Sequence, residues 1–197
     1  MLFPTSSDAL RGWGCSVSTE SPIPGTSIRP MTAQDVPQAS QLERRLFPHD
    51  AWPERFFYDE LAQAEPSVEP HRATRAYWVA EKGDRLLGYA GMMCVLPLAD
   101  VQTLAVAPEA QGRGLGSHLL DLIEQEARRR GAEDLLLEVR QDNPRAQKLY
   151  LRSGFEQIHL RREYYPDGGD ALIMRKRLAE PPPRVGPIGS DRRGAHE

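Results

Sequence analysis

The first half of the chain combines helical and extended hydrophobic patterns. A short strand is expected at residues 27–29. Apolar side chains then recur at helical spacing over 36–46, where Asp35 is a suitable N-cap, and again over 53–61; a proline follows each stretch. Three strands joined by hairpins are predicted next, over residues 77–80, 85–96 and 100–106.

The second half alternates helices with strands. Apolar positions from Leu115 to Ala127 predict an amphipathic helix that ends in three arginines and Gly131, residue types suited to the C-terminal end of a helix. The apolar run 135–139 is typical of a strand covered on both faces. The remaining elements, one helix and two strands, are expected at 144–153, 155–164 and 171–177. This order of elements indicates a mixed α/β sheet.

Composition narrows the class of protein. The 197 residues are 40% hydrophobic and 27% charged, which is ordinary for one globular domain. A net charge of −3 gives no reason to expect direct nucleic-acid binding. No membrane span, signal peptide or metal-ligand spacing is present in the sequence, so we expect a cytoplasmic protein without a metal. Low apolar content predicts disordered ends at 1–25 and 180–197, around a folded unit at 26–179.

A glycine-rich loop lies between the strand ending at Val106 and the helix that follows. The segment 111–117 reads Gln-Gly-Arg-Gly-Leu-Gly-Ser, so unpaired backbone N–H groups and a helix N-terminus face the same point, as an anion site requires. A Walker A loop would need a terminal Gly-Lys-Ser/Thr, and the alternating glycines do not fit G-x-G-x-x-G. The spacing Q-x-x-G-x-G instead resembles the acetyl-CoA loop of the GNAT superfamily, whose amides hold a pyrophosphate. A plain glycine-rich turn is the alternative.

Two side chains beyond this loop are candidates for proton transfer. Glu138 lies in an otherwise apolar strand, where partial burial should raise its pKa and suit it to accept a proton from an amine. Tyr150, on the next helix, offers a hydroxyl to a leaving thiolate. A salt bridge from Glu138 to an arginine such as Arg140, and core packing of Tyr150, are the structural alternatives.

A second resemblance covers residues 27–178. The segment 137–155 reads Leu-Glu-Val-Arg-x-x-Asn-x-x-Ala-x-x-Leu-Tyr-x-x-x-Gly-Phe and resembles the bacterial ribosomal-protein alanine N-acetyltransferases of the RimI type. The resemblance implies a GNAT fold, a mixed and mostly antiparallel sheet of seven strands flanked by four helices. It makes Glu138 the proton acceptor and Tyr150 the proton donor, and places Trp52, Tyr164 and Tyr165 on the acceptor side. The acetyl-CoA contacts it implies are Leu104, Ala105, Val106, Gln111, Gly112, Arg113, Gly114, Leu115, Gly116, Ser117 and Asn143.

The resemblance implies that the chain acetylates the N-terminal amine of a protein, with an alanine-starting small-subunit ribosomal protein as acceptor. Two alternatives remain at this point. One is a GNAT enzyme for a small amine or a lysine side chain, which predicts an acidic acceptor pocket. The other is a non-catalytic acetyl-CoA-binding subunit, which predicts loss of the proton-handling residues. We expect the segment 66–75 to be longer than the corresponding connection in that family, either as a change in the acceptor groove or as a surface insertion.

Overall fold

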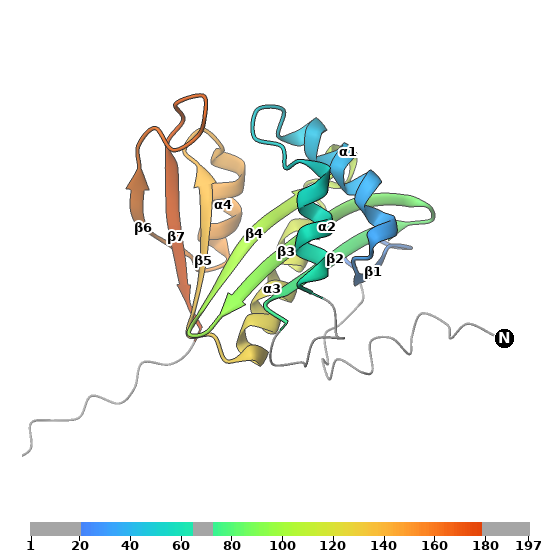
Figure 1. Cartoon of the computed structure of the whole chain (residues 1–197), viewed down its shortest axis with the longest axis horizontal. Helices are drawn as coiled ribbons and strands as arrows, with labels where there is room; N and C mark the ends of the chain where they lie inside the picture. Colours follow the sequence, from blue (N-terminus) through green and yellow to red (C-terminus); the bar gives the residue numbers. More distant parts are fainter. Residues whose placement is uncertain (1–20, 65–72, 179–197) are drawn as a thin grey trace, which may run out of the picture.

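A computed structural model describes residues 21–64 and 73–178, and these form one twisted sheet between two layers of helices (Figure 1). The sheet has seven strands in the order β1-β2-β3-β4-β5-β7-β6. The strands are β1 (Ser27–Pro30), β2 (Arg75–Lys82), β3 (Arg85–Val95), β4 (Leu98–Val106), β5 (Asp134–Arg140), β6 (Glu156–Arg161) and β7 (Ala171–Arg177). The helices are α1 (Val36–Leu46), α2 (Glu54–Ala62), α3 (Leu115–Arg130) and α4 (Pro144–Arg152), with short 3-10 turns η2 (Ala33–Asp35) and η3 (Pro108–Ala110). The expected fold class is confirmed.

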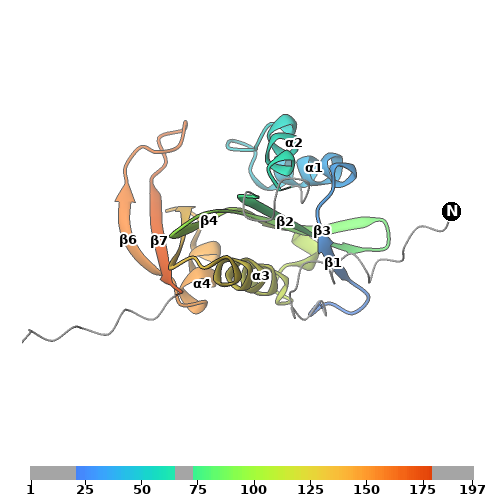
Figure 2. The same ribbon diagram turned by 60° about the horizontal axis from the view of Figure 1, so that its bottom comes forward.

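The helices divide between the two faces of the sheet. Helices α1 and α2 lie on one face, and α3 and α4 lie on the other (Figure 2). Neighbouring strands pair antiparallel, except that β4 pairs parallel with β5 through the crossover helix α3. One core packs between the sheet and α3, and a second packs between the sheet and the α1–α2 layer. Among the described residues, no helix is long and apolar enough to span a membrane.

The β4–β5 pair separates part of the way along its length. Its registered partners run from Leu98 opposite Asp134 to Val101 opposite Leu137, whereas β4 continues to Val106 and β5 to Arg140. Beyond that point the two strands diverge, as Figure 1 shows. A parallel sheet that opens in this way leaves backbone groups on both strands available to a ligand.

A bulge in β4 adjoins this opening. Gly91 faces Thr103 while the next residue, Met92, faces Val101, so Gln102 is an extra residue on β4. The bulge moves the odd-numbered side chains of β4 from one face of the sheet to the other. Val101 therefore packs in the α3 core, whereas Ala105 packs in the α1–α2 core. The Gln102 side chain accepts a hydrogen bond of 2.7 Å from the Tyr77 hydroxyl.

Two expectations about burial need correction. Strand β5 is not covered on both faces, because the strand residues of the α1–α2 core come from β2, β3 and β4; Glu138 on that face is exposed. Ile23, expected in a disordered lead-in at 1–25, is 1% exposed in the α3 core, so the folded unit begins before Thr26. Residues 1–20 and 179–197, and most of the segment 66–75, lie outside the described residues.

Candidate active site

The glycine-rich loop connects β4 to α3 through left-handed backbone conformations. Gly112 has φ +74° and Gly114, the residue before α3, has φ +85°. The Gln111 side chain donates to the Val106 carbonyl at 2.8 Å and accepts a hydrogen bond from Arg145 of α4, which ties the loop to its strand and to the neighbouring helix. The first N–H groups of α3, which have no partner within the helix, therefore occupy a fixed position.

A cavity of about 580 Å³ adjoins this loop and the opening between β4 and β5. Nine residues implied by the resemblance line it: Leu104, Ala105, Val106, Gln111, Gly112, Gly114, Gly116, Ser117 and Asn143. Arg113 and Leu115 are not among the lining residues, and the Leu115 side chain is 1% exposed in the α3 core. Asn143 accepts a hydrogen bond from the Ala146 N–H at 3.1 Å, so it also caps α4.

Sequence reasoning missed the opposite wall of this cavity. Arg145, Lys148 and Arg152 of α4 line it, as do Leu46 and Phe47 at the end of α1. The three basic residues are spaced by three and four positions, so they share one helix face, and that periodicity was a readable signal. The cavity thus combines helix N-terminal amides, three cations and apolar side chains.

These features fit acetyl-CoA. Its pyrophosphate suits the loop amides and the positive end of the 16-residue helix α3. A Cβ added to Gly116 would lie 3.5 Å from Leu149 Cδ2 and 3.7 Å from Val106 Cγ2, both on residues of the cavity wall. The absence of a side chain at Gly116 therefore leaves room between β4 and α4 for the part of acetyl-CoA that extends from the pyrophosphate toward the thioester. Among the described residues, no cluster of His, Cys, Asp and Glu could hold a metal ion.

Glu138 lies on β5 just beyond the last β4–β5 pair. Its side chain is 35% exposed and forms an ion pair of 2.5 Å with Arg161, which reaches across β7 from β6. The ion-pair partner of this carboxylate is therefore Arg161 instead of Arg140. The carboxylate also hydrogen-bonds with Tyr164, which raises the pKa of Tyr164.

Tyr150 lies on the inner face of α4 in the α3 core. Its side chain is 8% exposed, and its ring centroid is 5.8 Å from that of Phe155. Burial, with a smaller contribution from Tyr165, raises the pKa of Tyr150 to about 12. The core-packing alternative is thus correct for the ring, and the hydroxyl keeps its proton at neutral pH.

Tyr165 connects the two candidate proton-transfer groups. Burial and then the charge of Glu138 raise the pKa of Tyr165 to about 12. The Tyr165 phenol in turn makes a smaller electrostatic contribution that raises the pKa of Tyr150. The Tyr165 ring lies perpendicular to the Tyr164 ring, with centroids 5.2 Å apart. The predicted group of Glu138, Tyr150, Tyr164 and Tyr165 is therefore brought together, although none of these four lines the cavity described above.

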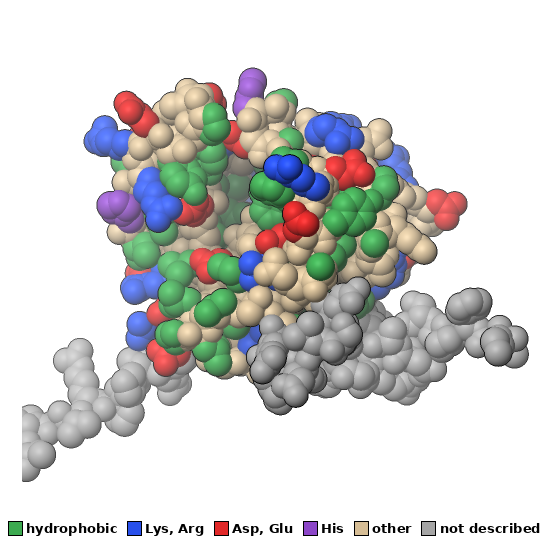
Figure 3. Space-filling view, in the orientation of Figure 1, with side chains coloured by type: hydrophobic (Ala, Val, Ile, Leu, Met, Phe, Trp, Pro, Cys, Tyr) green, Lys and Arg blue, Asp and Glu red, His purple; other side chains and the backbone are tan. Residues whose placement is uncertain are grey.

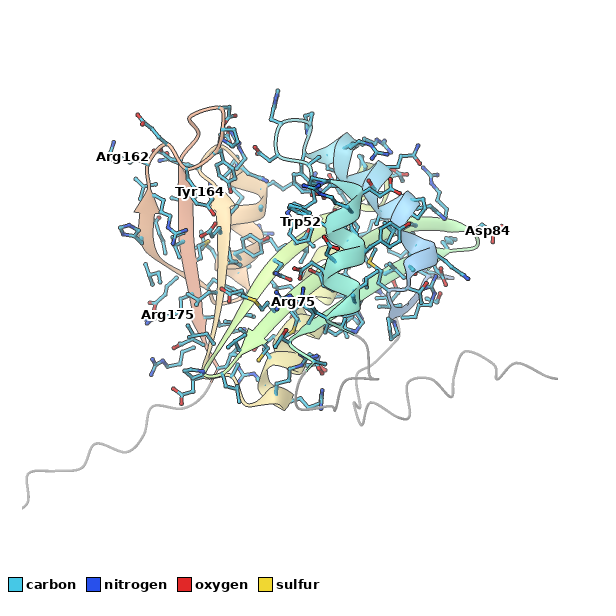
Figure 4. All side chains as sticks on the ribbon, in the orientation of Figure 1. Trp52, Arg75, Asp84, Arg162, Tyr164 and Arg175 are labelled. Carbon is cyan, nitrogen blue, oxygen red and sulfur yellow. The ribbon has the colours of Figure 1, made fainter. Side chains whose placement is uncertain are left out.

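A hollow separates the β5–β7 side of the molecule from the α1–α2 side, as the space-filling view shows (Figure 3). Trp52, from the α1–α2 connection, and Tyr164, from the β6–β7 connection, lie on its two sides (Figure 4). The Trp52 ring packs on Phe57 with ring centroids 5.6 Å apart, and the Trp52 backbone N–H donates to the Glu43 carboxylate at 3.2 Å. Trp52 and Tyr164, both implied by the resemblance, thus lie on opposite sides of one hollow.

Asp100 is a further polar residue on the sheet beside Glu138. It lies on β4 opposite Leu136, and burial and then the negative charge of Glu138 raise its pKa. The nearby Glu60 carboxylate forms an ion pair with Arg75 and accepts a hydrogen bond from Tyr77 at 3.1 Å. An aspartate at the start of a predicted strand was visible in the sequence, but its proximity to Glu138 depends on the pairing of β4 with β5.

Known proteins are similar to this chain in sequence and in fold. Residues 36–155 match the acetyltransferase (GNAT) family. The N-alpha-acetyltransferase RimI of Mycobacterium tuberculosis is 37% identical over 161 residues, covering 79% of this chain and 94% of that protein. An uncharacterized Mycobacterium leprae protein is 39% identical over 155 residues, which are 76% of this chain but 40% of that longer protein.

A solved structure gives the same result. The crystal structure of the Escherichia coli ribosomal-protein-S18-alanine N-acetyltransferase superposes with a TM-score of 0.67 at 29% identity, covering 82% of this chain and 99% of that one. The family match over residues 36–155 includes the glycine-rich loop and the segment with Glu138 and Tyr150. The chain therefore belongs to the GNAT acetyltransferase family.

Proposed function

We propose that this chain transfers the acetyl group of acetyl-CoA to the N-terminal α-amine of a protein, with an alanine-starting small-subunit ribosomal protein as its acceptor. The observation that carries the proposal is the position of the Glu138 carboxylate beside Tyr164 and Tyr165, where β4 and β5 separate. The names of the relatives agree: the Escherichia coli neighbour is an S18-alanine N-acetyltransferase. Such acceptors are made in the cytoplasm, which is where we place the enzyme.

In this mechanism the loop 111–117 and the basic face of α4 would hold the phosphates of acetyl-CoA, which would supply the acetyl thioester. Glu138 accepts a proton from the α-ammonium, and the neutral amine then attacks the thioester carbonyl carbon, forming the C–N bond as the C–S bond breaks. An α-amine has a pKa near 7.7–8.0, against about 10.4 for lysine, so a modest base is sufficient for the α-amine. Tyr150, protonated at neutral pH because its pKa is about 12, donates to the leaving thiolate.

A lysine side chain or small amine is the second candidate acceptor. The half-buried Asp100 beside Glu138 favours it, because two neighbouring carboxylates attract a cation. The non-catalytic alternative predicts that the proton-handling residues are lost, and both Glu138 and Tyr150 are present.

An acetylation assay on short peptides that differ in the first residue separates these acceptors. We expect the Ala-starting peptide to be preferred strongly over an N-terminally blocked peptide that contains lysine. Glu138→Gln should lower turnover at pH 7 by about 10²-fold, and part of the loss should return at higher pH as the amine deprotonates unaided. Glu156→Gln is the matched control, because Glu156 forms a similar ion pair of 2.6 Å with Arg175 on neighbouring strands.

Preference for the blocked lysine peptide would refute the N-terminal assignment while leaving acetyl-CoA as the donor. Full activity of Glu138→Gln at pH 7 would show that the carboxylate is structural. Equal losses in Glu138→Gln and Glu156→Gln would indicate a general effect of breaking a surface ion pair.

A further inference from the structure

Arg140, at the end of β5, holds three carboxylates with one guanidinium. It lies 2.7 Å from Asp50, 2.7 Å from Asp167 and 3.0 Å from Asp142. The guanidinium carbon also lies 4.5 Å from the centroid of the Tyr165 ring. The Arg140 and Asp50 side chains are each 20% exposed, so this ion pair is better shielded from solvent than an ordinary surface pair.

Two of these partners come from the loops that contain Trp52 and Tyr164. Asp50 belongs to the α1–α2 connection, two residues before Trp52, and Asp167 belongs to the β6–β7 connection, two residues after Tyr165. These loops approach each other at the same end of the sheet, at the top of Figure 1, although Asp50 and Asp167 are 117 residues apart in the sequence. Asp142 differs, because it follows Arg140 by two residues and links no second loop.

The turn in the β6–β7 loop packs directly against the Arg140 guanidinium. Asp167 accepts the Gly169 N–H at 3.1 Å, and the Tyr165 N–H donates to the Gly169 carbonyl at 3.0 Å. A Cβ added to Gly169 would lie 2.7 Å from Arg140 Nη2, so this turn has no space between its backbone and the cation. Movement of Arg140 would therefore displace the turn that follows Tyr165.

Loss of the cation would affect both loops in the same direction. Without Arg140, the three carboxylates of Asp50, Asp142 and Asp167 would face one another with no counter-charge, and like charges at this distance repel. The segments 47–53 and 162–170 would then separate, and with them Trp52, Tyr164 and Tyr165. No contact of this cluster involves the cofactor loop.

We propose that Arg140 is a positioning residue that joins the loops 47–53 and 162–170 and thereby sets the affinity for the acceptor. This inference rests on the proposed function, since it assigns the acceptor to the hollow between those loops. It predicts a change in acceptor KM that is larger than the change in CoA affinity, because the loop 47–53 lines the cofactor cavity through Phe47 alone, with little change in kcat at saturating acceptor.

The test compares Arg140→Gln, Arg140→Lys, Asp50→Asn and Asp167→Asn with Asp142→Asn as the matched control. Steady-state kinetics on the Ala-starting peptide give KM and kcat, calorimetry gives CoA affinity, and hydrogen exchange reports on 47–53 and 162–170. We expect Arg140→Gln to raise peptide KM by about ten-fold, because it removes charge-assisted hydrogen bonds to both loops. Arg140→Lys should give an intermediate value, because an ammonium cannot bridge both carboxylates with a planar fork.

Each Asn variant should loosen mainly its own loop: Asp50→Asn the segment 47–53, and Asp167→Asn the segment 162–170. Unchanged KM and unchanged exchange in Arg140→Gln would overturn the proposal. So would an effect of Asp142→Asn as large as that of Asp167→Asn, since charge alone would then explain it. If the wild-type enzyme acetylates no free N-terminus, the proposed function fails, and hydrogen exchange still decides whether Arg140 holds the loops.

Discussion

Replacing Gly114 by alanine isolates the contribution of the loop backbone to cofactor binding. Gly114 has φ +85° immediately before α3, and an L-residue held in that region costs about 1–2 kcal/mol. Packing adds little, because the new Cβ would lie 3.5 Å from the Pro22 side chain, an ordinary contact. The enzyme should therefore stay folded, with a loss of stability of that size.

The cost to binding should be larger than the cost to folding. If the backbone relaxes away from φ +85°, the N–H groups of the first turn of α3 turn with it. A hydrogen bond to a charged group contributes about 1.5–3 kcal/mol, so loss of one such bond to the pyrophosphate weakens CoA affinity about 10–100-fold.

Gly131→Ala is the matched control at the other end of the same helix. Gly131 has φ +89°, and no atom lies within 4 Å of an added Cβ, so it carries the same backbone cost away from the cavity. Thermal unfolding should show similar destabilisation of both variants, while calorimetry with CoA should show weaker binding only for Gly114→Ala. Equal CoA affinities in the two folded variants would refute the assignment of this loop to the pyrophosphate.

Three further predictions follow from buried groups. Tyr150→Phe should lower the chemical rate by 10²-fold or less while CoA still binds, and an unchanged single-turnover rate would leave Tyr150 with a packing role only. Ile23→Ala should lower the free energy of unfolding by about 2–5 kcal/mol in denaturant titrations, because Ile23 is 1% exposed; a negligible change would return it to an unpacked lead-in. Stability should also fall as pH rises from 10 to 12: the unfolded state ionises its tyrosines first, while the pKa of Tyr150 in the folded state is about 12. Tyr150 alone accounts for up to about 3 kcal/mol, and Tyr150→Phe should reduce this pH dependence of unfolding.

The sequence by itself determined the features that depend on near neighbours in the chain. Helix and strand positions followed from apolar periodicity, and the loop geometry followed from glycines at 112 and 114, where the backbone has positive φ. Eight of the nine predicted cofactor contacts that line one cavity do so for the same reason, since a strand, a loop and a helix N-terminus that are consecutive in sequence are consecutive in space; the ninth, Asn143, precedes α4.

Tertiary structure alone decided which distant charges meet. The sheet order β5-β7-β6 brings Arg161 to Glu138 across 23 residues, and leaves Arg140 free to bind Asp50 and Asp167 instead. The α1–α2 layer stops at β4, so Glu138 lies on a part of the sheet that no helix of this layer covers. Periodicity records which face of an element is apolar, but the partner of a charged side chain is set by strand order and by loop contacts, which local spacing does not encode.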